Sequence, residues 1–241
     1  MSRFAIFSSC LLLALMATAG AAEAADMPRS GFFDSYSKLQ PVDASRNSYR
    51  YTSDQLKEIL STTQAIVIPQ PEIFLADDSK YKGISPDELK MLADTFQSLI
   101  IEALADRYQI AQRPGPNTIV LRTALTNVHL KRKGRIPVLG YMPTAFVITS
   151  IKRIGDELTD KIMLTEVTWE AEMLDGGNAD VLLQLLVPMG NYSTKKEFTS
   201  WDDLVIAISV GGMRLRCRLD NAADGSAKNC LDITEADLPA Q

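Results

Sequence analysis

Three glutamates of one predicted strand, Glu166, Glu170 and Glu172, are the first side chains to consider for chemistry. They alternate with mostly apolar residues over residues 162–174, so we expect them on one face of that strand. Paired carboxylates can hydrolyse a glycosidic bond when the two groups are suitably spaced. Any solvated strand face gives the same alternation, and the sequence favours that explanation over catalysis.

The other candidates for catalysis lack the partners that their chemistry needs. Ser193 and Lys196 have the Ser-x-x-Lys spacing of penicillin-recognising enzymes, but the further motifs of those enzymes are absent. His129, the only histidine, has no cysteine or acid beside it in the sequence. One histidine and three cysteines exclude a structural zinc site with four cysteines, or with two cysteines and two histidines. We predict no catalytic residue, no metal ligand and no cofactor.

Residues 1–24 have the features of a secretory signal peptide. Arg3 precedes an apolar run from Phe4 to Ala17, and an Ala-x-Ala triplet ends at Ala24. The apolar run is shorter than the ~20 residues of a membrane-spanning helix, which favours cleavage over a permanent anchor. We therefore predict an exported protein, periplasmic or associated with the cell envelope, that does not span a membrane.

Export changes how the cysteines are interpreted. Cleavage removes Cys10 and leaves Cys217 and Cys230, an even pair in an oxidising compartment. We predict a disulfide between these two residues, and two free thiols are the alternative. The bond would join the last predicted helix to a polar tail, residues 222–241.

The composition narrows the class of protein. Hydrophobic residues make up 46% of the 241 residues and charged residues 23%, which is typical of a globular domain. The net charge of -5 argues against a nucleic-acid binder. The cluster from Lys131 to Arg135 has a solvated turn as its ordinary explanation, with binding to an anionic lipid or glycan as the alternative.

The periodicity predicts an α+β fold with two main helices. Ser85, Pro86 and Glu88 form a capping box with proline at the first helical position, so a helix is expected from Pro86 to about residue 106. A second long helix follows Ser200, and a shorter one is expected over residues 143–154. Strands are expected at residues 65–68, 118–130, 162–174 and 181–187. These elements predict a single domain, residues 53–221, with a mixed or antiparallel sheet covered by two helices.

Residues 25–52 are predicted to form an extended arm that lies on this domain. Phe32, Phe33 and Tyr36 supply large aromatic contact area, so they are the first candidates for contact with a partner. The alternative is that these rings attach the arm to its own domain.

Several segments carry a family resemblance. They are residues 30–39, 65–69, 114–116 and 172–177, together with the helix that begins Trp201-Asp202-Asp203. In these segments the chain resembles a bacterial cell-envelope family known only as a domain of unknown function, type 3313, whose members are mostly predicted lipoproteins. The lipid-modified cysteine expected after the signal peptide is missing here. The resemblance implies no catalytic residues and an α+β domain like those of envelope-assembly lipoproteins, which bind partners.

Together, these observations predict a non-enzymatic protein that binds an envelope protein or a cell-wall component. One alternative is a glycan or peptidoglycan hydrolase that uses Glu170 or Glu172. The other is a carrier of a small apolar ligand, which needs a closed cavity of roughly several hundred Å³. A cleft with two convergent carboxylates would favour the hydrolase, and an enclosed apolar cavity would favour the carrier.

Overall fold

The computed structural model of the chain describes residues 27–43, 46–132, 162–192, 198 and 201–238. The predicted signal peptide, the Ser193–Lys196 motif and the helix expected over residues 143–154 lie outside these ranges. Among the described residues, no helix is both long enough and apolar enough to cross a membrane.

The strands of the described residues form one eight-stranded mixed sheet with the order β1-β2-β8-β7-β6-β3-β5, and β4 also pairs with β6. The strands are β1 (Gln40–Asp43), β2 (Ser48–Thr52), β3 (Ala65–Val67), β4 (Glu72–Leu75), β5 (Gln109–Ala111), β6 (Thr118–Arg132), β7 (Ile162–Asp175) and β8 (Val181–Pro188). β3 runs parallel to β5 and β6, and β4 runs parallel to β6, whereas the other pairs are antiparallel. Pro69 and Pro71, which cannot donate ladder hydrogen bonds, separate β3 from β4 along β6.

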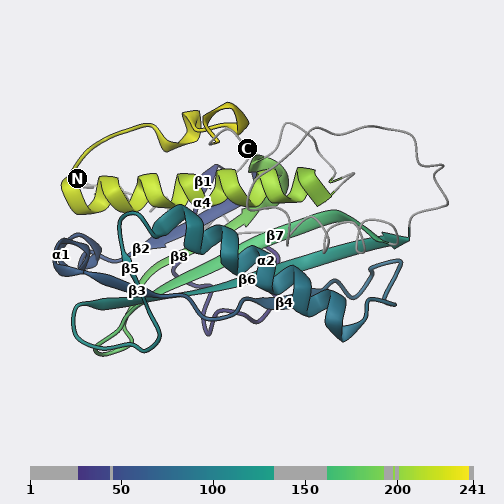
Figure 1. The fold of residues 1–241 in the computed structure, drawn as a ribbon, viewed down its shortest axis with the longest axis horizontal. Helices are drawn as coiled ribbons and strands as arrows, with labels where there is room; N and C mark the ends of the chain where they lie inside the picture. The colour runs from purple at the N-terminus through teal and green to yellow at the C-terminus, as the bar shows by residue number, and fades with distance from the viewer. Residues whose placement is uncertain (1–26, 44–45, 133–161, 193–197, 199–200, 239–241) are drawn as a thin grey trace, which may run out of the picture.

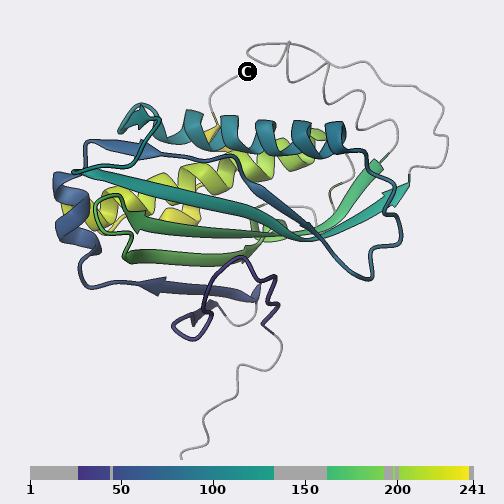
Figure 2. The same cartoon turned by 90° about the horizontal axis from the view of Figure 1, so that it is seen from below.

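Two long helices, α2 (Pro86–Leu104) and α4 (Trp201–Asp224), cover one face of this sheet (Figures 1 and 2). The predicted capping box at the start of α2 is present, with both the Ser85 and the Glu88 side chains bonded to backbone N–H groups. Phe96, Leu99 and Ile100 are buried, as the periodicity of the helix predicted. The short helix α1 (Leu56–Thr62) contacts α4. The α+β prediction is therefore confirmed.

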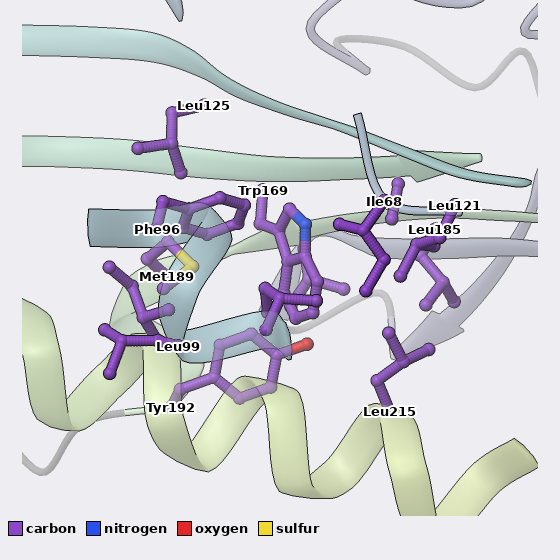
Figure 3. Close-up of a cluster of buried hydrophobic side chains, with 14 of the residues drawn as sticks. Ile68, Phe96, Leu99, Leu121, Leu125, Trp169, Leu185, Met189, Tyr192 and Leu215 are labelled. Carbon is purple, nitrogen blue, oxygen red and sulfur yellow. The ribbon is translucent and has the colours of Figure 1, made fainter. Parts of the chain in front are cut away.

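Trp169 lies at the centre of the core between the sheet and the helices (Figure 3). Its ring meets Phe96 edge-to-face, with centroids 5.7 Å apart, and Tyr192 at 6.0 Å. Gly211 of α4 lies against the same ring, and a Cβ there would come within 2.9 Å of the indole. The glycine therefore allows close packing of α4, which continues as one helix through this position.

The N-terminal segment differs from the predicted arm in its extent. Gln40–Asp43 and Ser48–Thr52 form β1 and β2. β1 pairs with β2, and β2 pairs with β8, so both strands belong to the sheet. Among the described residues, the arm is confined to residues 27–39. They lie across the face of the sheet opposite α2 and α4 (Figure 2), where Phe32, Phe33 and Leu39 pack on Ala124 and Leu186. The sheet is thus covered on both faces.

The C-terminal tail is attached by more than its disulfide. Cys217 of α4 and Cys230 form the predicted bond, with Cα atoms 5.7 Å apart. Cys230 begins the short helix η3 (Cys230–Asp232), and η4 (Glu235–Asp237) follows. Arg214 also donates hydrogen bonds to the carbonyl oxygens of Leu231 and Ile233. The tail is thus held both by the disulfide and by a buried arginine that binds its backbone.

The disulfide stabilises the fold mainly by constraining the unfolded chain, and closing a loop of this size is worth about 3 kcal/mol in the chain-entropy treatment. We expect Cys217→Ser/Cys230→Ser to lower the free energy of unfolding by about this amount, because Arg214 keeps the tail attached in the folded protein when the bond is removed. Urea unfolding of both proteins, with and without reductant, measures the difference. A loss far below this value would mean that the tail detaches once the bond is removed, and it would contradict a role for Arg214.

Candidate functional site

Glu170 and Glu172 lie beneath the arm, on the face of β7 opposite the helices. They are only 1% and 4% exposed, so the expectation of a solvated strand face was wrong for both. The cause is the arm, which covers this part of the strand. Glu166 lies beyond the register shift that β7 makes against β6 near His129, and its side chain is 67% exposed.

Each carboxylate oxygen of Glu170 has a hydrogen-bond donor. The Tyr36 hydroxyl of the arm donates to one oxygen at 2.8 Å, and the Thr126 hydroxyl of β6 donates to the other at 2.8 Å. Burial raises the pKa of the Tyr36 hydroxyl, and the neighbouring Glu170 adds to the rise against an opposing hydrogen bond with Ser30. Tyr36 is thereby kept as a proton donor to the buried carboxylate.

Glu172 is bonded in the same way from the neighbouring strands. Arg122 of β6 donates from Nη1 to one oxygen at 2.9 Å, and Gln184 of β8 donates to the other at 2.9 Å. The Arg122 guanidinium also lies 5.0 Å from the centre of the Phe32 ring. The two carboxylates therefore anchor the arm and bind neighbouring strands, and both are buried with each carboxylate oxygen hydrogen-bonded.

The aromatic residues of the arm pack inward. Phe32 and Phe33 are each 3% exposed, with ring centres 5.2 Å apart, and Phe33 lies 5.0 Å from Tyr36. In the structure the rings attach the arm to its own domain, which was the alternative to contact with a partner. In this conformation a partner could not reach Phe32 or Phe33.

The bond from Tyr36 to Glu170 gives a direct test of the arm's attachment. We expect Tyr36→Phe to lower the free energy of unfolding by about 2 kcal/mol, because it leaves one buried carboxylate oxygen without its donor. Hydrogen exchange should speed up in residues 30–39 more than elsewhere. Tyr49→Phe is the matched control, since the Tyr49 hydroxyl makes no hydrogen bond within the described part of the chain. Equal losses in the two variants would contradict the anchoring role.

His129 and the basic cluster do not join the buried carboxylates. The Nε2 atom of His129 lies 3.2 Å from Asn127 Oδ1, and 3.6 and 3.8 Å from carboxylate oxygens of Asp78 and Glu166. The acidic neighbours are thus close in space although they are distant in sequence. Lys131 and Arg132 end β6, and the rest of the cluster lies outside the described residues. Within the described ranges, no group of three or more side chains could hold a metal ion.

The sequence did not predict a cavity of about 490 Å³ beside β2, β8 and α4, near the β1 edge of the sheet. Its described lining residues are Val42, Arg46, Ser48, Tyr49, Arg50, Leu185, Val187, Asn191, Tyr192, Arg214, Arg218 and Leu231. Four of these are arginines, and none of the described lining residues is acidic. The cavity thus combines guanidinium groups with apolar side chains.

Two elements supply these four arginines. Arg46 and Arg50 lie just before and within β2, and Arg214 and Arg218 lie one turn apart on α4. Partial desolvation lowers the pKa of Arg50, although its side chain remains accessible to solvent, and repulsion from Arg218 adds to this effect. Burial likewise lowers the pKa of Arg214, and Arg218 and Arg46 contribute against an opposing effect of Tyr192. Because arginine remains protonated in proteins, the cavity carries a concentrated positive charge.

One of the four arginines is fixed by the fold. Arg214 is 7% exposed and donates to the carbonyl oxygens of Asn191, Leu231 and Ile233. Its guanidinium lies 5.3 Å from the centre of the Tyr192 ring. Arg214 is therefore a structural part of the wall, whereas Arg50 is exposed and Arg218 is partly exposed.

The only sequence signal for this cavity is weak. Arg214 and Arg218 have the four-residue spacing that places both on one side of α4. Their partners Arg46 and Arg50 are more than 160 positions away, in a segment predicted to be an arm. Pairing of β2 with β8 brings the two halves together, and the local pattern did not predict that pairing.

The fold, the buried carboxylates beneath the arm and the arginine-lined cavity define an α+β protein. Helices cover one face of its sheet, and an arm covers the other. The chain belongs to the family described as "Protein of unknown function (DUF3313)", which matches residues 28–211. This confirms the resemblance to an uncharacterised family. The match includes the arm, Glu170 and Glu172, but it ends before Arg214 and Arg218 and before both cysteines of the disulfide.

Among solved structures, the chain is similar to a dodecamer of a single-substitution variant of PelC from Paraburkholderia phytofirmans. The two are 12% identical, the alignment covers 71% of this chain and 95% of that chain, and the TM-score is 0.36. The comparison with curated proteins finds no match.

Proposed function

We propose that the mature protein acts in the cell envelope without catalysis, by binding an anionic envelope partner at the arginine-lined cavity. The observation that carries this proposal is the cavity itself. Four arginines and several apolar side chains line about 490 Å³, a volume within the usual range of ligand sites. Guanidinium groups are suited to bind carboxylate and phosphate groups through paired hydrogen bonds.

Export is part of the proposal, and two features support it. Residues 1–24 have the pattern of a cleaved signal peptide. The disulfide between Cys217 and Cys230 is the kind of bond that persists in oxidising compartments. Sequencing the N-terminus of the protein recovered from the envelope should give a chain that begins near Ala25. An intact Met1 on protein from the cytoplasm would contradict export.

The geometry supports binding better than it supports the two alternatives. Glu170 and Glu172 are buried and engaged on every oxygen, so a hydrolase would first have to displace the arm. A carrier for a purely apolar ligand would have to bury that ligand against Arg50 and Arg218, which is unfavourable because desolvating a charged group is costly. A partner with an anionic group avoids that cost.

Photocrosslinking in cells tests the site of binding. A photoreactive amino acid replaces Val42 at the cavity rim in one variant and Ile110 of the edge strand β5 in the other. Both residues are exposed apolar positions, with 49% and 37% exposure, so they are matched. We expect crosslinked envelope material from position 42, and we expect Arg218→Glu to reduce it. Equal crosslinking at both positions would contradict the cavity as the site.

A separate measurement tests the absence of catalysis. Purified protein is incubated with peptidoglycan, and soluble fragments are followed with time. We expect no release above the level of a heat-treated control. Cleavage that Glu170→Gln abolishes would overturn the proposal in favour of the hydrolase.

A further inference from the structure

The composition of the cavity wall indicates more than a general preference for anions. Within the described residues, only three large hydrophobic side chains are notably exposed, and two of them, Val42 and Leu231, line this cavity. They are 49% and 51% exposed. Exposed apolar side chains scattered singly need no explanation, but two at the mouth of a charged cavity indicate that its ligand has an apolar part.

Two guanidinium groups of the cavity wall, those of Arg50 and Arg218, could bind one anion together. Arg50 and Arg218 come from β2 and α4, which bring their charges close enough to repel each other. In the described part of the chain, no carboxylate forms an ion pair with either side chain. Two guanidinium groups from separate elements can bind one phosphate or carboxylate from two sides, which would relieve their mutual repulsion.

The rest of the wall provides a rigid frame for such a ligand. Leu185 and Val187 of β8 belong to the main core, and Tyr192 meets Trp169 edge-to-face and lies against the Arg214 guanidinium. The Tyr192 hydroxyl is buried beside the Arg218 side chain. A preformed wall lowers the entropic cost of binding, because few side chains must be ordered when the ligand arrives.

We propose that this cavity binds a single-chain amphipathic anion, with its phosphate or carboxylate between Arg50 and Arg218 and its apolar chain against Val42 and Leu231. This inference rests on the proposed function, and it names the chemical class of the ligand. The apolar chain accounts for the exposed rim, which a purely hydrophilic anion would leave in water. The head group accounts for the charges of Arg50 and Arg218, which would have no anionic partner from the described residues beside a neutral chain.

Titration of the purified mature protein with defined probes tests the inference. The probes are decyl phosphate, decanoate, decyl maltoside and inorganic phosphate, and binding is followed by calorimetry. The three amphiphiles are used below their critical micelle concentrations. We expect one molecule of decyl phosphate or of decanoate to bind per chain, and the two together distinguish a phosphate head group from a carboxylate. Decyl maltoside, which has the same chain without charge, and inorganic phosphate, which has no chain, should each bind at least tenfold more weakly.

Single substitutions assign the two halves of the site. Arg50→Met and Arg218→Met should each weaken decyl phosphate binding about tenfold, as expected for loss of one charge-assisted hydrogen bond. Leu231→Ser should weaken decyl phosphate binding several-fold and leave inorganic phosphate binding unchanged. Arg113→Met is the matched control, because it removes one exposed arginine just after β5, at the opposite edge of the sheet, and should change nothing.

Four outcomes would overturn the inference. Inorganic phosphate that binds as tightly as decyl phosphate would show a site for small anions only. Decyl maltoside that binds as tightly would show an apolar site without a role for the arginines. If neither decyl anion binds while position 42 still crosslinks to an envelope partner, the ligand class is wrong and the proposed function stands. If neither decyl anion binds and position 42 does not crosslink, both proposals fail.

Discussion

Replacing Trp169 with alanine should lower the free energy of unfolding by about 3–5 kcal/mol, the usual cost of removing a large buried aromatic side chain. The indole is 2% exposed and contacts α2 through Phe96 and α4 at Gly211, so the cavity left behind would open between the sheet and both helices. Native domains are stable by only about 5–15 kcal/mol, so this variant should unfold at a much lower urea concentration. Urea unfolding followed by circular dichroism measures the loss.

Trp169→Phe is the matched control for this substitution. The indole Nε1 group has no hydrogen-bond partner among the described residues, so phenylalanine removes area without breaking a hydrogen bond. We expect a loss of less than half that of the alanine variant. A phenylalanine variant as unstable as the alanine variant would mean that the indole N–H group is engaged in the folded protein.

The same contact predicts that substitutions at Trp169 and Gly211 are coupled. In the wild-type protein, Gly211→Ala should destabilise, because the new Cβ would lie 2.9 Å from the indole ring and 3.3 Å from the Tyr192 ring. In the Trp169→Ala background much of that space is open, and alanine is favoured over glycine in a helix by about 1 kcal/mol. Gly211→Ala should therefore become neutral or stabilising there. Equal effects in the two backgrounds would contradict the packing described for α4.

Local signals in the sequence predicted most of the secondary structure. The capping box at Ser85 and the apolar stripe through Phe96 are contained within one helix, so no distant contact is needed to recognise them. The pairing of β7 with β8 follows from a short turn between two alternating segments. The disulfide could be predicted because the expected cleavage of residues 1–24 would leave only two cysteines.

Contacts between distant segments determined what the sequence could not predict. Glu170 is buried because Tyr36, 134 positions earlier, lies over it. A strand face that will be covered by an arm has the same alternating pattern as a strand face in water. The arginine-lined cavity has the same origin, since Arg50 and Arg218 meet only through the pairing of β2 with β8 and the docking of α4. Both sites are therefore properties of the tertiary fold.

The buried pair of Arg122 and Glu172 gives the other large effect that we expect. Arg122→Met should lower the free energy of unfolding by about 3 kcal/mol, because it leaves a buried carboxylate with Gln184 as its remaining partner. This is the low end of the range for buried pairs, since the Arg122 side chain is 35% exposed and that of Glu172 is 5% exposed. Arg122 also forms an ion pair with Glu72 at 3.5 Å, but this pair is largely exposed and contributes little to stability.

The double variant Arg122→Met/Glu172→Met separates the cost of an unpaired charge from the loss of packing. A hydrophobic pair of similar volume in place of a buried ion pair is often as stable as the pair itself. The site lies against the Phe32 ring, which is well suited to contact methionine side chains. We therefore expect the double variant to recover most of the stability that Arg122→Met loses. Arg113→Met is the control for loss of surface charge. If the double variant were as unstable as Arg122→Met alone, the loss would come from packing of the arginine side chain. The proposed role of Arg122 in compensating the buried carboxylate would then be wrong.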